Sequence, residues 1–203
     1  MNRTIILLMF SDVFVVTGFG LMEPILAIFI KENLVGGTIF AAGLASAIFL
    51  ATKSVVQLPF SRYVDRDEDK VRWLVIGAFL ISLVPMIYIF SKHIYHIYAA
   101  QALFGIGSGL AYPAWLSLWS INLDKKQEGF EWSLYSTLAG LGAATTATIG
   151  AAIAEFIGFT YTFLLVGIMS LIGVGILLFL HSEHKKNGFR KQYYKRRKLI
   201  DEE

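Results

Sequence analysis

Three ionisable residues stand out within long apolar runs of this chain: Asp12, Glu23 and Lys53. An ionisable group inside a membrane-spanning helix costs about 2.5–3.5 kcal/mol on insertion scales, and such groups usually mark a path for a solute or an ion. A carboxyl group in low dielectric also gains and loses protons in a different range from one in water, which coupling to a proton gradient requires. The three residues therefore predict transport chemistry.

Asp12 and Lys53 are predicted to lie at the same depth. Asp12 is eight residues past Thr4 and Lys53 is eight before Ser61, which places each roughly 12 Å from the inner surface at 1.5 Å per residue. A short loop joins their helices, so we expect antiparallel neighbours with an ion pair facing the bundle interior. Two alternatives stay open: Lys53 extends its ammonium to the headgroups, or the first span starts later and Asp12 lies at the inner interface.

Glu23 precedes Pro24, which cannot donate a hydrogen bond to the helix and loosens it locally. If the first helix ends near Ile30, Glu23 lies about 10 Å from the outer surface, and Gln101 lies at a similar depth. Glu23 is thus a candidate proton carrier. The alternative is a carboxylate hydrogen-bonded to neighbouring helices or exposed in an outer vestibule.

Tyr112, Trp115 and Trp119 are spaced i, i+3 and i+7, which places them on one helix face. Such a face could line a cavity through stacking and cation–π contacts. The alternative is ordinary packing, with Trp119 in the interfacial aromatic belt. Small residues on two helices favour close helix approach, and the candidate packing glycines are Gly105, Gly109, Gly142 and Gly150.

No nucleophile and base pattern is visible, so no enzyme is predicted, and no cofactor or metal site. The histidine pairs His93 with His96 and His181 with His184 have i, i+3 spacing but no third ligand. We interpret them as interfacial histidines.

The composition sets the elements that must position these residues. The chain has 203 residues, 56% hydrophobic and 16% charged, whereas soluble domains carry about 25% charged residues. Runs of about 20 apolar residues cross a bilayer as helices. We predict an all-α integral membrane protein, a six-transmembrane-helix bundle with spans at residues 4–30, 37–60, 72–91, 94–121, 133–156 and 159–181. The first run is too long for a signal peptide core.

The distribution of basic residues predicts that both termini are cytoplasmic. Of the 18 Lys and Arg residues, 15 then lie on the cytoplasmic side, Lys31 and Lys92 lie outside, and Lys53 lies in the membrane. Residues 1–182 form the predicted transmembrane domain and residues 183–203 a basic tail. The tail is expected to bind anionic lipid, at about 1 kcal/mol per basic residue, and no nucleic acid.

The loop after the second predicted span, "SRYVDRDEDKVR", resembles the signature cytoplasmic loop of the major facilitator superfamily. Asp65 and Arg66 match its centre, Lys70 and Arg72 match its basic end, and Ser61 stands where the family has glycine. The resemblance implies that this loop takes part in gating on the cytoplasmic side.

Three further segments resemble the drug and proton antiporters of that superfamily. They are "DVFVVTGFGLMEPILAIFI" in the first span, "QALFGIGSGLAYPAWLSL" in the fourth and "GLGAATTATIGAAIAEFIG" in the fifth. Gln101 stands where the antiporters have arginine, and Thr146 and Ala147 replace a Gly-Pro pair. The resemblance extends over all six spans and corresponds to the N-terminal half of a twelve-helix transporter, built of two six-helix halves.

The resemblance implies a half-size transporter of a small organic solute in a prokaryotic plasma (inner) membrane; the alternative is a shortened form of a longer transporter. We expect a parallel homodimer with alternating access and proton-coupled efflux, in which Asp65 approaches Trp132 and Ser133 of the second copy. The alternative is a non-transporting membrane subunit or one half of a heteromeric carrier. The departures at Gln101, Thr146 and Ala147 keep that alternative open.

Overall fold

The computed structural model describes residues 2–201, with side chains described for residues 2–183. The described chain is all-helical, apart from an isolated bridge between two loops. Its helices are α1 (Arg3–Asn33), α2 (Ile39–Arg66), α3 (Lys70–Ile89), α4 (Ile94–Asn122), α5 (Glu128–Phe156) and α6 (Phe159–Asp201). The predicted all-α fold is confirmed.

Polar residues at the helix starts explain where several helices begin. Asn2 accepts a hydrogen bond from the Thr4 backbone nitrogen at 3.1 Å, and Thr38 accepts one from Ala41 at 3.0 Å. Such caps satisfy backbone donors that have no partner within the helix. In the loop before α2, Gly36 has a φ of 80°, a left-handed conformation that glycine adopts without strain.

Among the described residues, five helices are long and apolar enough to cross a membrane: α1, α2, α3, α5 and the Phe159–Glu183 part of α6. Helix α4 is 29 residues long but is not one of the five. It carries Gln101, several glycines and serines, and four Tyr or Trp residues between Tyr98 and Trp119, which lower its mean hydropathy. A sixth span at α4 stays a prediction.

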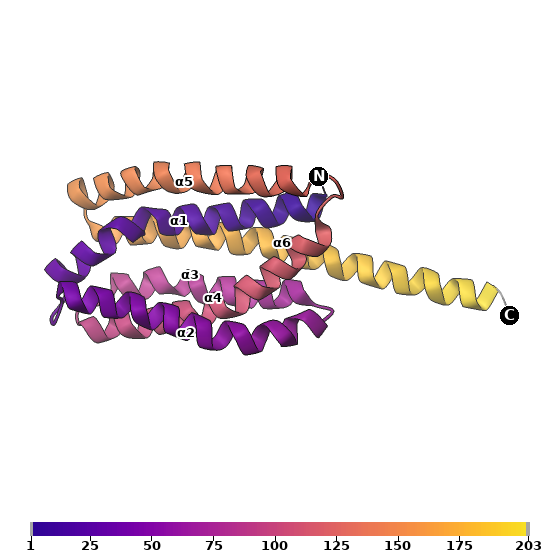
Figure 1. Ribbon diagram of the computed structural model, residues 1–203, viewed down its shortest axis with the longest axis horizontal. Helices are drawn as coiled ribbons and strands as arrows, with labels where there is room; N and C mark the ends of the chain where they lie inside the picture. The colour runs from indigo at the N-terminus through magenta and orange to yellow at the C-terminus, as the bar shows by residue number, and fades with distance from the viewer. Residues whose placement is uncertain (1, 202–203) are drawn as a thin grey trace.

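The helices pack as two related three-helix units. Helix α1 packs mainly on α5 and α6, α4 packs mainly on α2 and α3, and α3 contacts α6. Exchanging α1–α3 with α4–α6 leaves this set of contacts unchanged, the pattern of two internal repeats. Helices α5 and α2 therefore lie at opposite edges of the bundle (Figure 1).

The expectation that the first two helices are antiparallel neighbours holds only in part. Helices α1 and α2 touch only slightly, because the first helix of each unit packs between the second and third helices of the other. A short loop fixes the order and direction of two helices, but here the main packing surface of each comes from the other unit.

One end of the bundle gathers the N-terminus, the α2–α3 and α4–α5 connections and the continuation of α6 (Figure 1). We call it the basic end, because Arg3, Arg66 and Lys70 lie there. Asn2 donates to Asn122 at 3.1 Å, and Arg3 pairs with Glu183 at 3.0 Å. These contacts tie the start of α1 to the ends of α4 and of the bundle part of α6.

Helix α6 continues to Asp201 and leaves the bundle at the basic end (Figure 1). The backbone of most of the predicted basic tail is thus part of this helix. Its side chains beyond residue 183 lie outside the described part, and the division of the chain at residue 182 stays a prediction.

Four glycines lie where helices cross closely. A Cβ built on Gly105 would lie 2.7 Å from Thr52 of α2, and one on Gly109 would lie 2.8 Å from Val56. On α5, a Cβ at Gly142 would overlap the Thr17 side chain, and one at Gly150 would overlap the Leu21 backbone of α1. The two central helices are therefore held against the edge helices at positions where a side chain does not fit.

Candidate solute-binding cavity

A cavity of about 240 Å³ lies toward the middle of the bundle, between the two central helices and the edge helices. Its polar and charged wall groups come from four different helices. They are Asp12 (α1), Lys53 (α2), Ser108 and Tyr112 (α4) and Tyr135 (α5). We call this space the inner cavity. The sequence predicted Asp12 and Lys53 as site residues, and both line this cavity, whose wall is mostly apolar.

The Asp12 carboxylate is held by a tyrosine of α5. The Tyr135 hydroxyl donates a hydrogen bond to Asp12 Oδ2. This contact follows from the packing of α1 on α5, which brings two residues 123 positions apart face to face. Tyr135 was not predicted as a site residue, since nothing in its local sequence distinguishes it from a packing aromatic.

Lys53 rests on aromatic rings. Its Nζ lies 4.6 Å from the centroid of the Tyr112 ring and 6.0 Å from that of Phe49, within the range of a cation–π interaction. Among the described residues no ion pair joins Lys53 to Asp12. The predicted pair is therefore corrected: both residues line the inner cavity, but each has an aromatic partner, because their helices are not packed together.

A second cavity, of about 360 Å³, adjoins the first on the side away from the basic end. We call it the outer cavity. Glu23, Ser46 and Gln101 contribute its polar wall. The Gln101 side chain is only 4% exposed, and its Oε1 has no hydrogen-bond partner among the described residues. Glu23 is exposed and likewise has no hydrogen-bond or ion-pair partner among the described residues. The outer cavity therefore presents two hydrogen-bond acceptors without a partner in the described part of the chain, Gln101 Oε1 and the Glu23 carboxylate.

Three stacked phenylalanines separate the two cavities. The Phe104 ring lies 4.6 Å from Phe19 at 20° and 4.4 Å from Phe49 at 23°, and all three residues line both spaces. They come from α1, α2 and α4. The sequence does not distinguish them, because each is one of 16 phenylalanines and only the helix packing brings them together.

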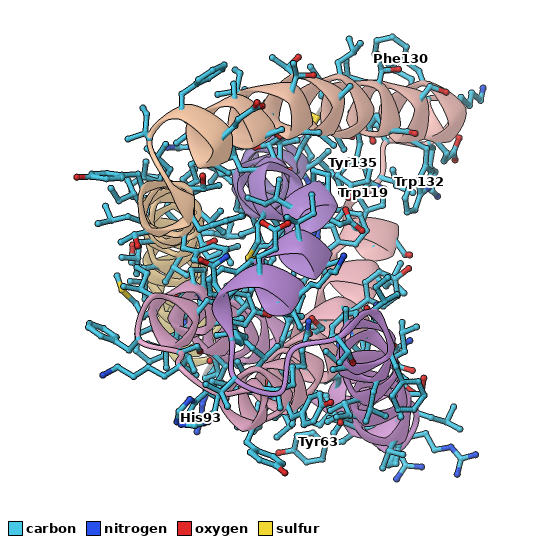
Figure 2. The ribbon with its side chains drawn as sticks, turned by 90° about the vertical axis from the view of Figure 1, so that its left-hand side faces the viewer. Tyr63, His93, Trp119, Phe130, Trp132 and Tyr135 are labelled. Carbon is cyan, nitrogen blue, oxygen red and sulfur yellow. The ribbon has the colours of Figure 1, made fainter. Side chains whose placement is uncertain are left out.

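An aromatic cluster closes the inner cavity toward the basic end. Trp119 stacks on Trp115 at 5.0 Å and lies 5.3 Å from Trp132 and 5.2 Å from Tyr135. Figure 2 shows Trp119, Trp132 and Tyr135 gathered between α4 and α5. Trp119 is 0% exposed, so its expected place in an interfacial belt is corrected to buried packing, whereas Tyr112 and Trp115 line the inner cavity.

The loop between α2 and α3 is organised by Lys70. Its Nζ donates to the backbone oxygens of Val64 at 2.6 Å, Asp67 at 2.8 Å and Asp65 at 3.2 Å. An ammonium here satisfies carbonyls at the end of α2 and opposes the negative end of its dipole. Lys70 therefore fixes how α2 ends.

The other signature-loop residues point outward or onto rings. Arg72 lies 5.5 Å from the Trp73 ring, and Arg66 is exposed. Asp65 is exposed and lines a groove between α2 and α4 that also contains Ser61 and Ser117. Asp65 is thus available to a second molecule or domain at the basic end.

Asp67 was not predicted as a site residue. Its carboxylate accepts hydrogen bonds from Trp73 Nε1 at 2.7 Å and from the Asp69 backbone nitrogen at 2.9 Å. These bonds, the Trp73 bond above all, lower the pKa of Asp67 below its ordinary value. The Asp67 carboxylate therefore links the loop to the first turn of α3.

Comparison with known proteins identifies the family. The model of the Major Facilitator Superfamily matches residues 8–201, and the chain belongs to that superfamily, as its signature loop predicted. An uncharacterized transporter of Buchnera aphidicola subsp. Schizaphis graminum is 27% identical over 171 residues, which are 81% of this chain and 42% of that protein. The chain thus spans less than half the length of this relative.

The fold is also found in a solved transporter structure. PepTSo, a transporter of the POT family, superposes with a TM-score of 0.70 at 16% sequence identity. The match covers 88% of this chain and 37% of PepTSo. At this identity the likeness concerns the fold alone.

Proposed function

We propose that the chain is one six-helix half of a membrane transporter for a small organic solute. The observation that carries the proposal is the inner cavity, where Asp12 and Lys53 line one space inside a mostly apolar bundle. Charged groups in such a place are costly unless they serve a solute or ion path. Membership of the superfamily and the transporter relative support the same conclusion.

All six helices span the membrane in this proposal, with the basic end in the cytoplasm. The bundle supports this arrangement, because the chain passes from one end to the other in each helix and the predicted cytoplasmic residues gather at one end (Figure 1). The positive-inside rule then gives the orientation. The bacterial relative favours a prokaryotic inner membrane.

A second six-helix unit completes the solute path, and we propose a second copy of this chain. Tyr112 lines the inner cavity yet is 42% exposed, and Glu23 is exposed in the outer cavity. Such groups do not face lipid cheaply. A copy related by a two-fold axis along the membrane normal covers them with the same surface. Asp65 then approaches Trp132 and Ser133, which lie just after the first turn of the second copy's α5.

Glu23 is the proposed proton carrier for coupled efflux. Its carboxylate is free of described partners and shares the outer cavity with the unsatisfied Gln101. A carboxyl group in this position can be protonated from the outer side while the phenylalanine stack closes the inner cavity. Proton binding and solute binding then occur on opposite sides of one aromatic barrier.

Flux through proteoliposomes tests the function. The purified chain is reconstituted, and uptake of labelled amino acids, organic cations and sugars is measured with and without a pH gradient. We expect at least one solute to move faster than in protein-free vesicles, and Glu23→Gln to remove the effect of the gradient while exchange without a gradient persists. Gradient-driven flux equal to wild type in Glu23→Gln would exclude the role of Glu23.

Crosslinking tests the second copy. The chain has no cysteine, so Asp65→Cys and Ser133→Cys can be placed in separately tagged copies and coexpressed. A disulfide or short crosslink between the two tags is expected in membranes, whereas Ile39→Cys, at the opposite end of α2 from Asp65, paired with Ser133→Cys should give none. Absence of any crosslink with added solute or changed pH, together with absence of flux, would favour the non-transporting subunit.

A further inference from the structure

The inner cavity contains one carboxyl group and one amino group that form no ion pair with each other. Asp12 is bonded to Tyr135 and Lys53 lies over Tyr112, and the described residues contain no ion pair between them. Helix α1 packs mainly on α5 and α6 and helix α2 mainly on α4, so the two residues are presented from helices with different packing partners. The space between them is the cavity itself.

Each charge has binding capacity left. A carboxylate offers two oxygens with about four lone-pair sites, and Tyr135 uses one of them at Oδ2. An ammonium has three donors, and Lys53 donates no hydrogen bond to any residue whose side chain is described. A cation–π contact satisfies the charge of Lys53 only in part. The cavity therefore presents one anionic and one cationic anchor.

Most of the rest of the wall is apolar or aromatic. It includes Phe49, Phe104, Leu74, Ile81 and Trp115. A lone organic cation would pair with Asp12 but would compete with Lys53 for the Tyr112 ring. A lone anion would pair with Lys53 and leave Asp12 as a second negative charge nearby. A ligand that carries both charges pairs with both anchors and brings no net charge into low dielectric.

The volume limits the size of such a ligand. About 240 Å³ is below the range of roughly 300–1,000 Å³ typical of pockets for drug-sized ligands. It suits a molecule of amino-acid size with one apolar or aromatic side group. The aromatic walls offer that group stacking contacts.

We propose that the inner cavity binds a small zwitterion, with its carboxylate at Lys53, its ammonium at Asp12 and its apolar side group against the aromatic wall. The inference rests on the proposed transport function and names its substrate class. Lys53 also acts as a selectivity residue, because its ammonium covers the ring face that an organic cation would use.

A matched set of three compounds tests the charge requirement. L-Phenylalanine carries both charges, phenylalaninamide only the ammonium, and N-acetylphenylalanine only the carboxylate. Their dissociation constants for the purified full chain are measured by titration calorimetry at pH 7. A hydrogen bond to a charged group contributes enough for a preference of about 10- to 100-fold, and we expect phenylalanine to bind that much more tightly than either analogue.

Two variants separate the anchors. Lys53→Met should make phenylalanine and phenylalaninamide bind equally, while the preference over N-acetylphenylalanine remains. Asp12→Asn should make phenylalanine and N-acetylphenylalanine bind equally, while the preference over phenylalaninamide remains. The asparagine side-chain oxygen can still accept the Tyr135 hydrogen bond, so this variant is expected to fold. Lys31→Met and Glu32→Gln remove exposed charges at the far end of α1 and should leave all three constants unchanged.

The outcomes distinguish this inference from the transport function. Equal binding of phenylalanine and its amide to wild type, or a preference that survives Lys53→Met, would overturn the proposed anchors. Absence of binding by all three compounds would overturn the substrate class, and flux of a singly charged solute in the proteoliposome panel would still uphold transport. Selective binding of phenylalanine without flux of any solute would uphold the site and refute the transport function.

Discussion

The close crossing of α1 and α5 gives a quantitative prediction about stability. Gly150 packs against the backbone of α1, and a Cβ built on it would lie 2.6 Å from both Cα and the carbonyl carbon of Leu21. Ordinary contact begins at 3.4 Å. Backbone atoms cannot rotate away as a side chain can, so Gly150→Ala must push the two helices apart.

Gly140 is a matched control on the same helix. A Cβ there would meet nothing within 4 Å. Replacing glycine by alanine inside a helix contributes about 0.5–1 kcal/mol of stability, and this gain is common to both variants. Overpacking costs about 1–3 kcal/mol and applies to Gly150 alone. We therefore expect Gly150→Ala to be less stable than Gly140→Ala by about 1–3 kcal/mol.

The free energy of unfolding is measured by titrating the detergent-solubilised chain with sodium dodecyl sulfate and following helicity by circular dichroism. Gly129, which also has no atom within 4 Å of a built Cβ, provides a second control at the start of α5. If Gly150→Ala were as stable as Gly140→Ala, the close α1–α5 crossing and the position of Asp12 beside Tyr135 would both be wrong.

Two further predictions concern the loop between α2 and α3. Lys70→Met removes three hydrogen bonds to backbone oxygens, and we expect a loss of about 1–2 kcal/mol, whereas Arg66→Met, at an exposed site, should change thermal stability little. The lowered pKa of Asp67 means that its stabilising effect is present above its unfolded pKa of about 3.9 and is lost as pH falls through the lower folded value. The difference in melting temperature between wild type and Asp67→Asn should therefore be larger at pH 7 than at pH 3, and an unchanged difference would contradict the bond to Trp73.

Much of the fold could be predicted from the sequence, because apolar runs of about 20 residues and their polar ends have few alternatives. The six predicted spans each fall largely within one helix, and "SRYVDRDEDKVR" was sufficient to predict the family that the comparisons show. Helix α4 shows where composition falls short: its polar and small residues reduce mean hydropathy because it lies in the centre of the bundle and lines both cavities.

The partners of the charged residues could not be predicted, because they depend on which helices pack together. Counting residues from the helix ends placed Asp12 and Lys53 at one depth, and they do line one cavity. Depth says nothing about rotation or neighbours. Because helices of one three-helix unit pack on helices of the other, Tyr135 of α5 lies beside Asp12 and Tyr112 of α4 lies against Lys53. No local sequence pattern predicts these two contacts.

The packing of helices from one three-helix unit on helices of the other also explains why Asp12 and Lys53 do not meet. If α1 packed along α2, Asp12 and Lys53 would meet and neutralise each other, and the pair would be structural. Because α1 packs on α5 and α2 packs on α4, each charge instead meets a tyrosine on the opposite unit, and a cavity remains between them. A tyrosine hydroxyl or ring stabilises a charge less than an opposite charge does, so a bound ligand can compete for it. The helix packing that prevents the predicted ion pair therefore also leaves Asp12 and Lys53 available to bind a solute.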